Sequence, residues 1–461
     1  MNQKYPRPYN DSGIGFHYFP DSDHYRREDA DRWAPRLTEL GASWLVMQTP
    51  PSRPVPDAFL QRIMVADIEP VVMIKPLRIG PLDVTTLAGT VRSLADSGVH
   101  YVVLFDRPNA RDSWSTQEWN KPELVERFVD YLLPALETVA GENLIPVLPP
   151  LDCLGAYWDT SFLQAMLESL IRRGGRPLIS GAAVGINNFA NNRTLDWGAG
   201  GPDAWPDARP YTEPAAGQDH RGFRLFEWYR PVLDRVLGQV LPFVVCANGP
   251  QRPIGGEPIG DEALHAERAL AMARMMTDGA LPDTVLNHAY WVLAAERGDP
   301  AYRQAWFRAD GVPRLPAAEA FLKLGKTRRA NLPAVEPAVE SWTAATETSK
   351  VASRAGTTVA GGEKPIAHYL LLPVFEWGLA RWHLSIIQEY LEAFLPTVGF
   401  SVQEAKLARH VTVIGNAQGI SVQAVRELEA AGCHVERIAG RTGDETQLLL
   451  KQLAQNKQHS R

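Results

Sequence analysis

Eight short apolar runs, separated by amphipathic stretches, are the feature of this sequence that most restricts its fold. The runs cover residues 15–19, 44–48, 70–74, 101–105, 144–148, 181–186, 243–246 and 284–287. Between them, stretches such as 27–40 and 122–139 carry apolar residues at helical spacing, with charges on the opposite face. Buried strands that alternate with amphipathic helices indicate parallel β/α architecture. The pattern therefore predicts the α/β class and a (β/α)8 barrel, the TIM-barrel fold.

A second domain is predicted because the chain has 461 residues, more than the roughly 250 that a typical barrel needs. Residues 330–364 are rich in Ala, Pro, Thr, Ser, Gly and Glu without periodicity, which predicts a flexible linker. We therefore expect a barrel over 1–329, the linker over 330–364 and a smaller α/β domain over 365–461. In that last domain we expect helices at 375–394, from Ser401, at 421–431 and at 445–454, with strands at 410–414 and 434–438, a half-Rossmann-like order.

Charge and cysteine usage exclude several kinds of partner. The net charge is -6 and the basic residues are scattered singly, so no basic stripe is available for a nucleic acid. Cys153, Cys246 and Cys433 lie far apart, and no histidine stands at i, i+4 spacing or in a Cys/His array. We therefore predict no disulfide framework, no metal site and no cofactor.

Targeting signals are not evident in the sequence. The opening MNQKYPRPYNDSG lacks a signal-peptide core, and no stretch approaches 18 uninterrupted apolar residues. We therefore expect no membrane span and, by default, a cytoplasmic location.

Polar and proline-rich segments follow most of the eight runs, where a barrel carries its site-forming loops. Asp106-Arg107-Pro108-Asn109 follows the fourth run, with Trp114 downstream, and Asn187-Asn188 follows the sixth. The seventh ends in Cys246-Ala247-Asn248-Gly249. These exits predict the position of the functional site.

Residues 13–300 resemble the large clan of retaining glycoside hydrolases on these same motifs. In that clan the fourth-strand motif reads Asn-Glu-Pro-Asn, the sixth-strand motif His-Asn-Tyr and the seventh-strand motif Thr-Glu-Gly-Gly. Arg107 and Ala247 replace the two glutamates that the resemblance would make catalytic. Retaining hydrolysis needs two carboxyl groups about 5 Å apart. Arginine cannot donate a proton at neutral pH and alanine offers no nucleophile, so the replacements predict an inactive barrel.

Candidate ligand-binding residues are the aromatic, amide, charged and imidazole side chains near the strand exits, since such groups stack on sugar rings or bond hydroxyls. They are His17, Tyr18, Lys75, Asp106, Arg107, Asn109, Trp114, Asn187, Asn188, Asn248, Gln251, His288 and Trp291. Packing anchors are the alternative role for the tryptophans, and turn capping is the alternative for Asn187 and Asn188. If hydrolysis survives, we expect displaced acids among Asp106, Asp152 and Glu257, although Arg107 would hold Asp106 ionised.

Residues 410–440 resemble a cell-wall-binding repeat of bacterial surface proteins. The resemblance lies in His410-Val-Thr-Val-Ile-Gly415, a helix that starts at Ser421, and Val435-Glu-Arg-Ile-Ala-Gly440. Asn416 stands where the repeat has a second glycine, and only one copy is present. The resemblance implies binding of a cell-envelope polymer and a location there, and the alternative is a small module that mediates assembly.

Three classes of function stay open. The leading hypothesis is a glycoside-hydrolase-like, catalytically inactive protein that binds carbohydrate or a cell-envelope polymer. The second is an active glycosidase that uses displaced carboxylates. The third is a structural or assembly protein built on a barrel scaffold, with self-association through the C-terminal domain. Fold alone does not decide among them.

Overall fold

The computed structural model describes residues 5–211, 217–252, 257–330, 332, 364, 366–373, 381–415, 420–439 and 443–459. The chain divides into two compact units, Met1–Val335 and Glu336–Arg461. Most of the predicted linker, 330–364, lies outside the described residues, as do 375–380 of the predicted helix and Asn416 of the predicted repeat.

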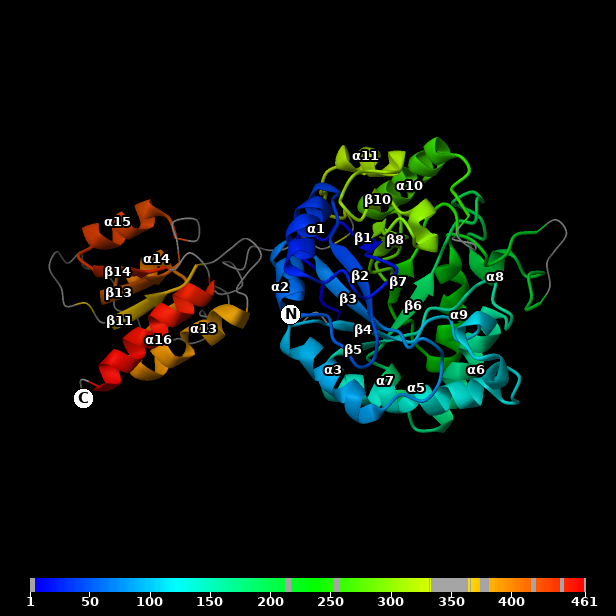
Figure 1. Ribbon diagram of the computed structural model, residues 1–461, viewed down its shortest axis with the longest axis horizontal. Helices are drawn as coiled ribbons and strands as arrows, with labels where there is room; N and C mark the ends of the chain where they lie inside the picture. The colour runs from blue at the N-terminus through cyan, green and yellow to red at the C-terminus, as the bar shows by residue number, and fades with distance from the viewer. Residues whose placement is uncertain are drawn as a thin grey trace, which may run out of the picture. The chain divides into compact units, whose positions relative to one another are not determined.

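A barrel of eight parallel strands forms the first unit and confirms the predicted fold class (Figure 1). The strands are β1 (Ile14–His17), β2 (Trp44–Thr49), β3 (Glu69–Ile74), β4 (Tyr101–Leu104), β5 (Ile145–Leu148), β6 (Ala183–Asn187), β7 (Phe243–Ala247) and β8 (His288–Tyr290). Their order is β7-β6-β5-β4-β3-β2-β1-β8. Isolated bridges, Phe243 to Val285 and Asn248 to Tyr290, connect β7 with the segment of β8, so the barrel is nearly closed.

Helices surround the barrel and bury their apolar faces against it (Figure 1). The longer ones are α1 (Arg27–Glu39), α2 (Asp57–Val65), α3 (Val84–Asp96), α5 (Leu124–Gly141), α6 (Asp159–Arg172), α9 (Leu225–Leu237), α10 (Glu262–Thr277) and α11 (Pro316–Leu322). The short ones are η1 (Arg111–Ser113), α4 (Thr116–Trp119), α7 (Arg176–Ile179), α8 (Gly201–Ala204) and η2 (Pro300–Gln304), and β9 (Ala294–Ala295) pairs with β10 (Phe307–Arg308). A separate cluster that includes Trp44, Met73 and Tyr101 fills the barrel interior, as in other barrels of this type.

The eighth strand begins later than predicted. Residues 284–287 are not a strand, and β8 is His288–Tyr290. Asn287 takes the place of a ladder residue, because its side chain accepts a bond from the Val245 main-chain N–H (2.9 Å) and donates to the Val245 carbonyl (3.0 Å). The apolar run 284–287 could not show this pairing, which depends on the neighbouring strand. His288 is consequently a buried strand residue and not a loop residue.

The second unit is a four-stranded parallel sheet in the order β12-β11-β13-β14, covered by helices on both faces. Its elements are β11 (Ile366–Leu371), α13 (Arg381–Phe394), β12 (Thr397–Gly399), α14 (Val402–Ala405), β13 (Ala408–Ile414), α15 (Val422–Ala430), β14 (His434–Ile438) and α16 (Gly443–His459). The predicted α/β class is confirmed, but β11 and β12 were not predicted. Among the described helices, none combines the length and apolarity that a bilayer crossing requires.

Candidate functional site

Polar side chains gather at the carboxyl ends of the barrel strands and in the loops directly after them, a region that we call the barrel mouth. His17 is the last residue of β1, and Asn187 is the last residue of β6. Lys75 follows β3 directly, and Asp106 follows β4 after one residue. Because parallel strands all end on the same side of a barrel, residues from widely separated parts of the chain meet there.

An ion-pair network joins the exits of β3 and β4. The Asp106 carboxylate accepts from Lys75 Nζ at 3.0 Å and from Arg107 Nε at 3.4 Å. Burial of Asp106 opposes its ionisation, but the charges of Lys75 and Arg107 outweigh burial and hold the pKa of Asp106 below its ordinary value. Arg107 also lies 3.3 Å from the exposed carboxylate of Asp112. Asp106 is therefore a carboxylate at neutral pH and not a proton donor.

Asp152 extends the network to the β5 exit. Arg107 Nη1 lies 3.5 Å from Asp152 Oδ2, and Arg252, from the loop after β7, donates to the same oxygen. The other oxygen, Oδ1, accepts the Leu154 main-chain N–H at 2.9 Å. The sequence analysis did not single out Arg252, although its position directly after Gln251 in a strand exit was a usable signal. Two guanidinium groups thus neutralise the second candidate acid.

Imidazole and amide side chains occupy the β1, β7 and β8 segments of the mouth. Asn248 Nδ2 lies 2.8 Å from His288 Nδ1, and His17 Nδ1 lies 3.1 Å from the Cys246 carbonyl. The Trp291 ring packs beside the His17 ring, with centroids 4.7 Å apart. Burial lowers the pKa of His17 to about 4 and that of His288 to about 3, so both rings are neutral at pH 7.

Several buried polar atoms of these residues have no hydrogen-bond partner within the described parts of the chain. They are His17 Nε2, Asn187 Oδ1, Asn188 Oδ1, Asn248 Oδ1, His288 Nε2 and Trp291 Nε1. Leaving a buried polar group unpaired costs about 1–3 kcal/mol, and native proteins normally pair such groups with protein, water or ligand. Their concentration at the strand exits indicates a place for a polar ligand or for ordered water.

The structure corrects three predicted ligand contacts. Tyr18 is fully buried beneath α1, and its hydroxyl donates to the His24 carbonyl (2.9 Å). Trp114 is 3% exposed, with its ring against Phe128 and its N–H bonded to a main-chain carbonyl. Asn109 is fully buried and braces a loop. In this structure the three side chains pack against or brace the mouth, and their polar atoms bond protein groups.

Glu257 and Gln251 are placed differently from the network residues. Glu257 is exposed in the segment before α10, and its main-chain carbonyl accepts from Gln304 Nε2 at 3.0 Å. Gln251 is half-buried shortly after β7. Neither side chain joins the Asp106 and Asp152 network within the described residues.

Replacing Asn109 with alanine is expected to cost the barrel about 2–3 kcal/mol of unfolding free energy. Asn109 Nδ2 donates to the carbonyls of Asp152 (2.7 Å) and Tyr157 (2.9 Å), and Oδ1 accepts the Asp152 N–H (2.8 Å). Alanine would leave these groups buried and unpaired. Urea unfolding measures the loss, and Asn120→Ala, at an exposed helix end, is the matched control with an expected change within about 0.5 kcal/mol. Equal losses in the two variants would contradict the bracing role.

No family model matches this sequence, and no curated protein matches it. Solved structures that are similar include a family 39 glycoside hydrolase from the gut symbiont Bacteroides cellulosilyticus WH2, with 11% identity, 70% of this chain and 66% of that chain covered, and a TM-score of 0.47. This chain thus spans just under two thirds of that enzyme.

Two further similar structures are glucanases. One is a GH128 (subgroup II) endo-β-1,3-glucanase from Sorangium cellulosum, with 14% identity, 68% of this chain and 98% of that chain covered, and a TM-score of 0.41. The other is the Pseudomonas stutzeri endoglucanase Cel5A, with 11% identity, 72% and 100% covered, and a TM-score of 0.40. Similarity at this level assigns neither an activity nor a substrate to this chain.

Proposed function

We propose that this glycoside-hydrolase-like barrel binds carbohydrate without hydrolysing it. The observation that carries the proposal is the charge state of the mouth. Arg107, a permanent cation, stands at the β4 exit where the sequence resemblance expects the proton donor, and Ala247 ends β7 where it expects the nucleophile. Burial opposes the charge on Arg107, but Asp106, Asp112 and Asp152 raise its pKa further.

The remaining acids of the mouth are poorly suited to replace the missing pair. A general acid must be protonated before it reacts, and the charges of Lys75 and Arg107 keep Asp106 ionised by lowering its pKa. Asp106 is held by Lys75 and Arg107, and Asp152 is held by Arg107 and Arg252. Either carboxylate would have to leave its partners in order to attack or protonate a sugar, which argues against displaced catalysis.

Sugar hydroxyls match the unpaired groups of the mouth. A hydroxyl both donates and accepts, so a sugar or a bridging water can bond Nε2 of His17, a residue that is 3% exposed, whereas Asn248 and His288 are fully buried. Trp291 is half-buried and adds an aromatic surface beside His17, and aromatic rings pack against the apolar faces of sugar rings. Lys75 and Asp106 supply charged partners at the same mouth. This combination supports a carbohydrate ligand.

Glycan-array binding without turnover is the expected result for the full chain. We expect Trp291→Ala to weaken the affinity for the bound glycan at least about 10-fold, because roughly 1.4 kcal/mol of stacking and hydrogen bonding is lost. Trp205→Ala, which removes another half-buried tryptophan near α8, is the matched control and should change the affinity less than about 2-fold. Turnover that disappears in Asp106→Asn or Asp152→Asn would overturn the proposal in favour of an active glycosidase.

The C-terminal unit extends the proposal through its sequence resemblance to a cell-wall-binding repeat. Such a repeat would direct the barrel to a cell-envelope polymer, and self-association is the competing role. Cosedimentation of the full chain with purified cell-wall polymer should occur at protein concentrations at which analytical ultracentrifugation finds one oligomeric state. Assembly that rises with concentration, without polymer binding, would favour the assembly role.

A further inference from the structure

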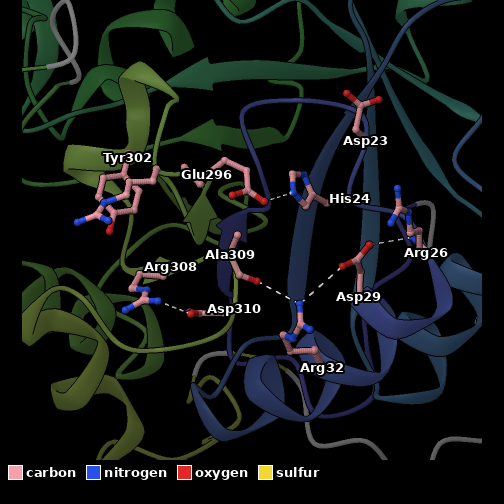
Figure 2. A pocket seen from close by; sticks show the side chains of 12 residues that line it. Asp23, His24, Arg26, Asp29, Arg32, Glu296, Tyr302, Arg308, Ala309 and Asp310 are labelled. Carbon is pink, nitrogen blue, oxygen red and sulfur yellow. Dashed lines mark hydrogen bonds and ion pairs between the residues drawn. The ribbon is translucent and has the colours of Figure 1, made fainter.

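A polar pocket lies beside α1, between the loop after β1 and the segment after β8 (Figure 2). Its volume is about 550 Å³, within the range of small-molecule sites. We call it the rim pocket. Main-chain bonds from Leu293 to the His17 carbonyl (2.7 Å) and from Ala294 to the Tyr18 carbonyl (3.2 Å) tie one of its walls to the end of β1. The rim pocket and the mouth therefore share the segment that runs out of β1.

The acids that line the rim pocket are already paired with cations. The pairs are Asp23–Arg53 (2.9 Å), Asp29–Arg32 (3.8 Å), Glu296–His24 (3.3 Å) and Asp310–Arg308 (2.5 Å). Figure 2 shows the last three pairs around the pocket. The negative charges of the lining are thus compensated by neighbours.

Two lining arginines bring positive charge that is not compensated in this way. Within the described parts of the chain, neither the Arg26 guanidinium nor the Arg297 guanidinium takes part in an ion pair. The contact between Arg26 and Asp29 is made by the Arg26 main-chain N–H (3.0 Å). Both arginines are exposed, one just before α1 and the other in the turn after β9. Water that now solvates them can be displaced by an anionic ligand.

His24 is a partner of two carboxylates and adds no uncompensated positive charge to the pocket. Its ring lies between Asp21 (2.8 Å) and Glu296 (3.3 Å). Burial alone would lower the pKa of His24, but these two carboxylates raise it above its ordinary value. The half-buried Tyr302 ring lines the pocket as well and offers an apolar face.

We propose that the rim pocket binds a saccharide chain that carries several carboxylates, with Arg26 and Arg297 each on its own carboxylate and Tyr302 against a sugar ring. Guanidinium groups bind carboxylates through paired N–H donors, which favours this anion chemistry. Paired side chains such as Asp29 and Glu296 remain able to accept hydroxyl hydrogens. The inference rests on the proposed carbohydrate function and names the class of glycan, a uronate-containing chain.

Calorimetric titration of the full chain with tetragalacturonate, and with cellotetraose as the neutral probe, tests this inference. The variant R26Q/R297Q should bind tetragalacturonate at least about 10-fold more weakly than the parent, the loss of roughly one charge-assisted contact. The matched control R230Q/R235Q removes the same charge from exposed positions on α9 and should change the affinity less than about 2-fold. All four positions are exposed, so folding is expected to be retained, and thermal melting checks it.

The outcomes separate this inference from the mouth proposal. The rim pocket is supported if R26Q/R297Q weakens tetragalacturonate binding while Trp291→Ala leaves it unchanged, a result that would leave the mouth without a demonstrated ligand. It is overturned if Trp291→Ala abolishes that binding while R26Q/R297Q does not, which would support the mouth alone. Three other results would also overturn the inference. They are no binding of tetragalacturonate at millimolar concentration, equal losses of affinity in the two arginine variants, and full competition by inorganic phosphate. Competition by phosphate would show that the pocket is a general anion site.

Discussion

Acidification from pH 7 to pH 5 is expected to destabilise the barrel by several kcal/mol. Burial lowers the pKa of His17 and His265 to about 4 and that of His288 to about 3. In the unfolded chain each imidazole regains an ordinary pKa near 6.5. Between pH 6.5 and about 4 the unfolded state therefore binds more protons than the folded state, and the unfolding free energy falls as the pH falls. At pH 5 each histidine lowers the unfolding free energy by about 2 kcal/mol, so three lower it by about 6 kcal/mol. This is a large share of the roughly 5–15 kcal/mol by which folded proteins are typically stable.

One histidine acts in the opposite direction. The pKa of His24 is raised in the folded state, so its contribution is present below pH 6.5 and is lost as the pH rises through the folded pKa. A single partly exposed group offsets only part of the loss from three buried ones. Asp106 and Asp219 have lowered pKa values, so protonation of the folded state at these carboxyls costs stability at still lower pH.

Urea unfolding at pH 7, 6 and 5 measures this dependence. His265→Gln removes one titrating ring away from the mouth, on α10, and should reduce the pH slope by about a third. His24→Gln is the control, and it should steepen the loss slightly because it removes the opposing group. A midpoint that stays constant from pH 7 to pH 5, or an unchanged slope in His265→Gln, would show that the buried imidazoles are not neutral in the fold.

Continuous apolar runs made most of the barrel strands predictable from the sequence. Seven of the eight apolar runs overlap the observed strands, because a strand buried on both faces needs a continuous apolar run. The eighth run did not predict its strand correctly, because there the Asn287 side chain bonds the main chain of Val245. Hydrogen bonding between residues 42 positions apart has no local signature in the sequence. In the second unit, β11 begins two residues after the end of the predicted linker, and β12 has only three residues. Neither strand was recognised from its sequence pattern.

The candidate site was likewise predictable only where the strand ends determine the position of a residue. The strand exits could be predicted because exits follow from strand ends, and His17, Lys75 and Asp106 lie there. Tyr18 could have been excluded, since neighbouring side chains point to opposite faces of a strand and His17 already faces the interior. The role of Asn109 could not be predicted, because it depends on the Asp152 and Tyr157 main chains more than 40 residues away.

Trp306→Ala is expected to cost about 3–5 kcal/mol, the largest loss from a single packing change that we predict. The Trp306 ring is fully buried, with ring centroids 5.0 Å from Phe16, 5.2 Å from Tyr290 and 4.8 Å from Phe321. Phe16 belongs to β1, Tyr290 to β8 and Phe321 to α11. The cluster thus joins the paired strands β1 and β8 to α11, through a tryptophan that lies just before β10. Trp306 therefore holds α11 against these two strands by side-chain packing.

Trp306→Phe separates packing from hydrogen bonding. The Trp306 indole N–H is buried and has no partner within the described residues, so phenylalanine removes no hydrogen bond and should cost less than half of the alanine variant. Trp119→Ala, at a half-buried position in α4, should cost about 1 kcal/mol or less. Urea unfolding of the three variants is the measurement. If Trp306→Ala cost no more than Trp119→Ala, the packing of α11 on β1 and β8 would have to come from the contacts that Phe16, Tyr290 and Phe321 make with one another.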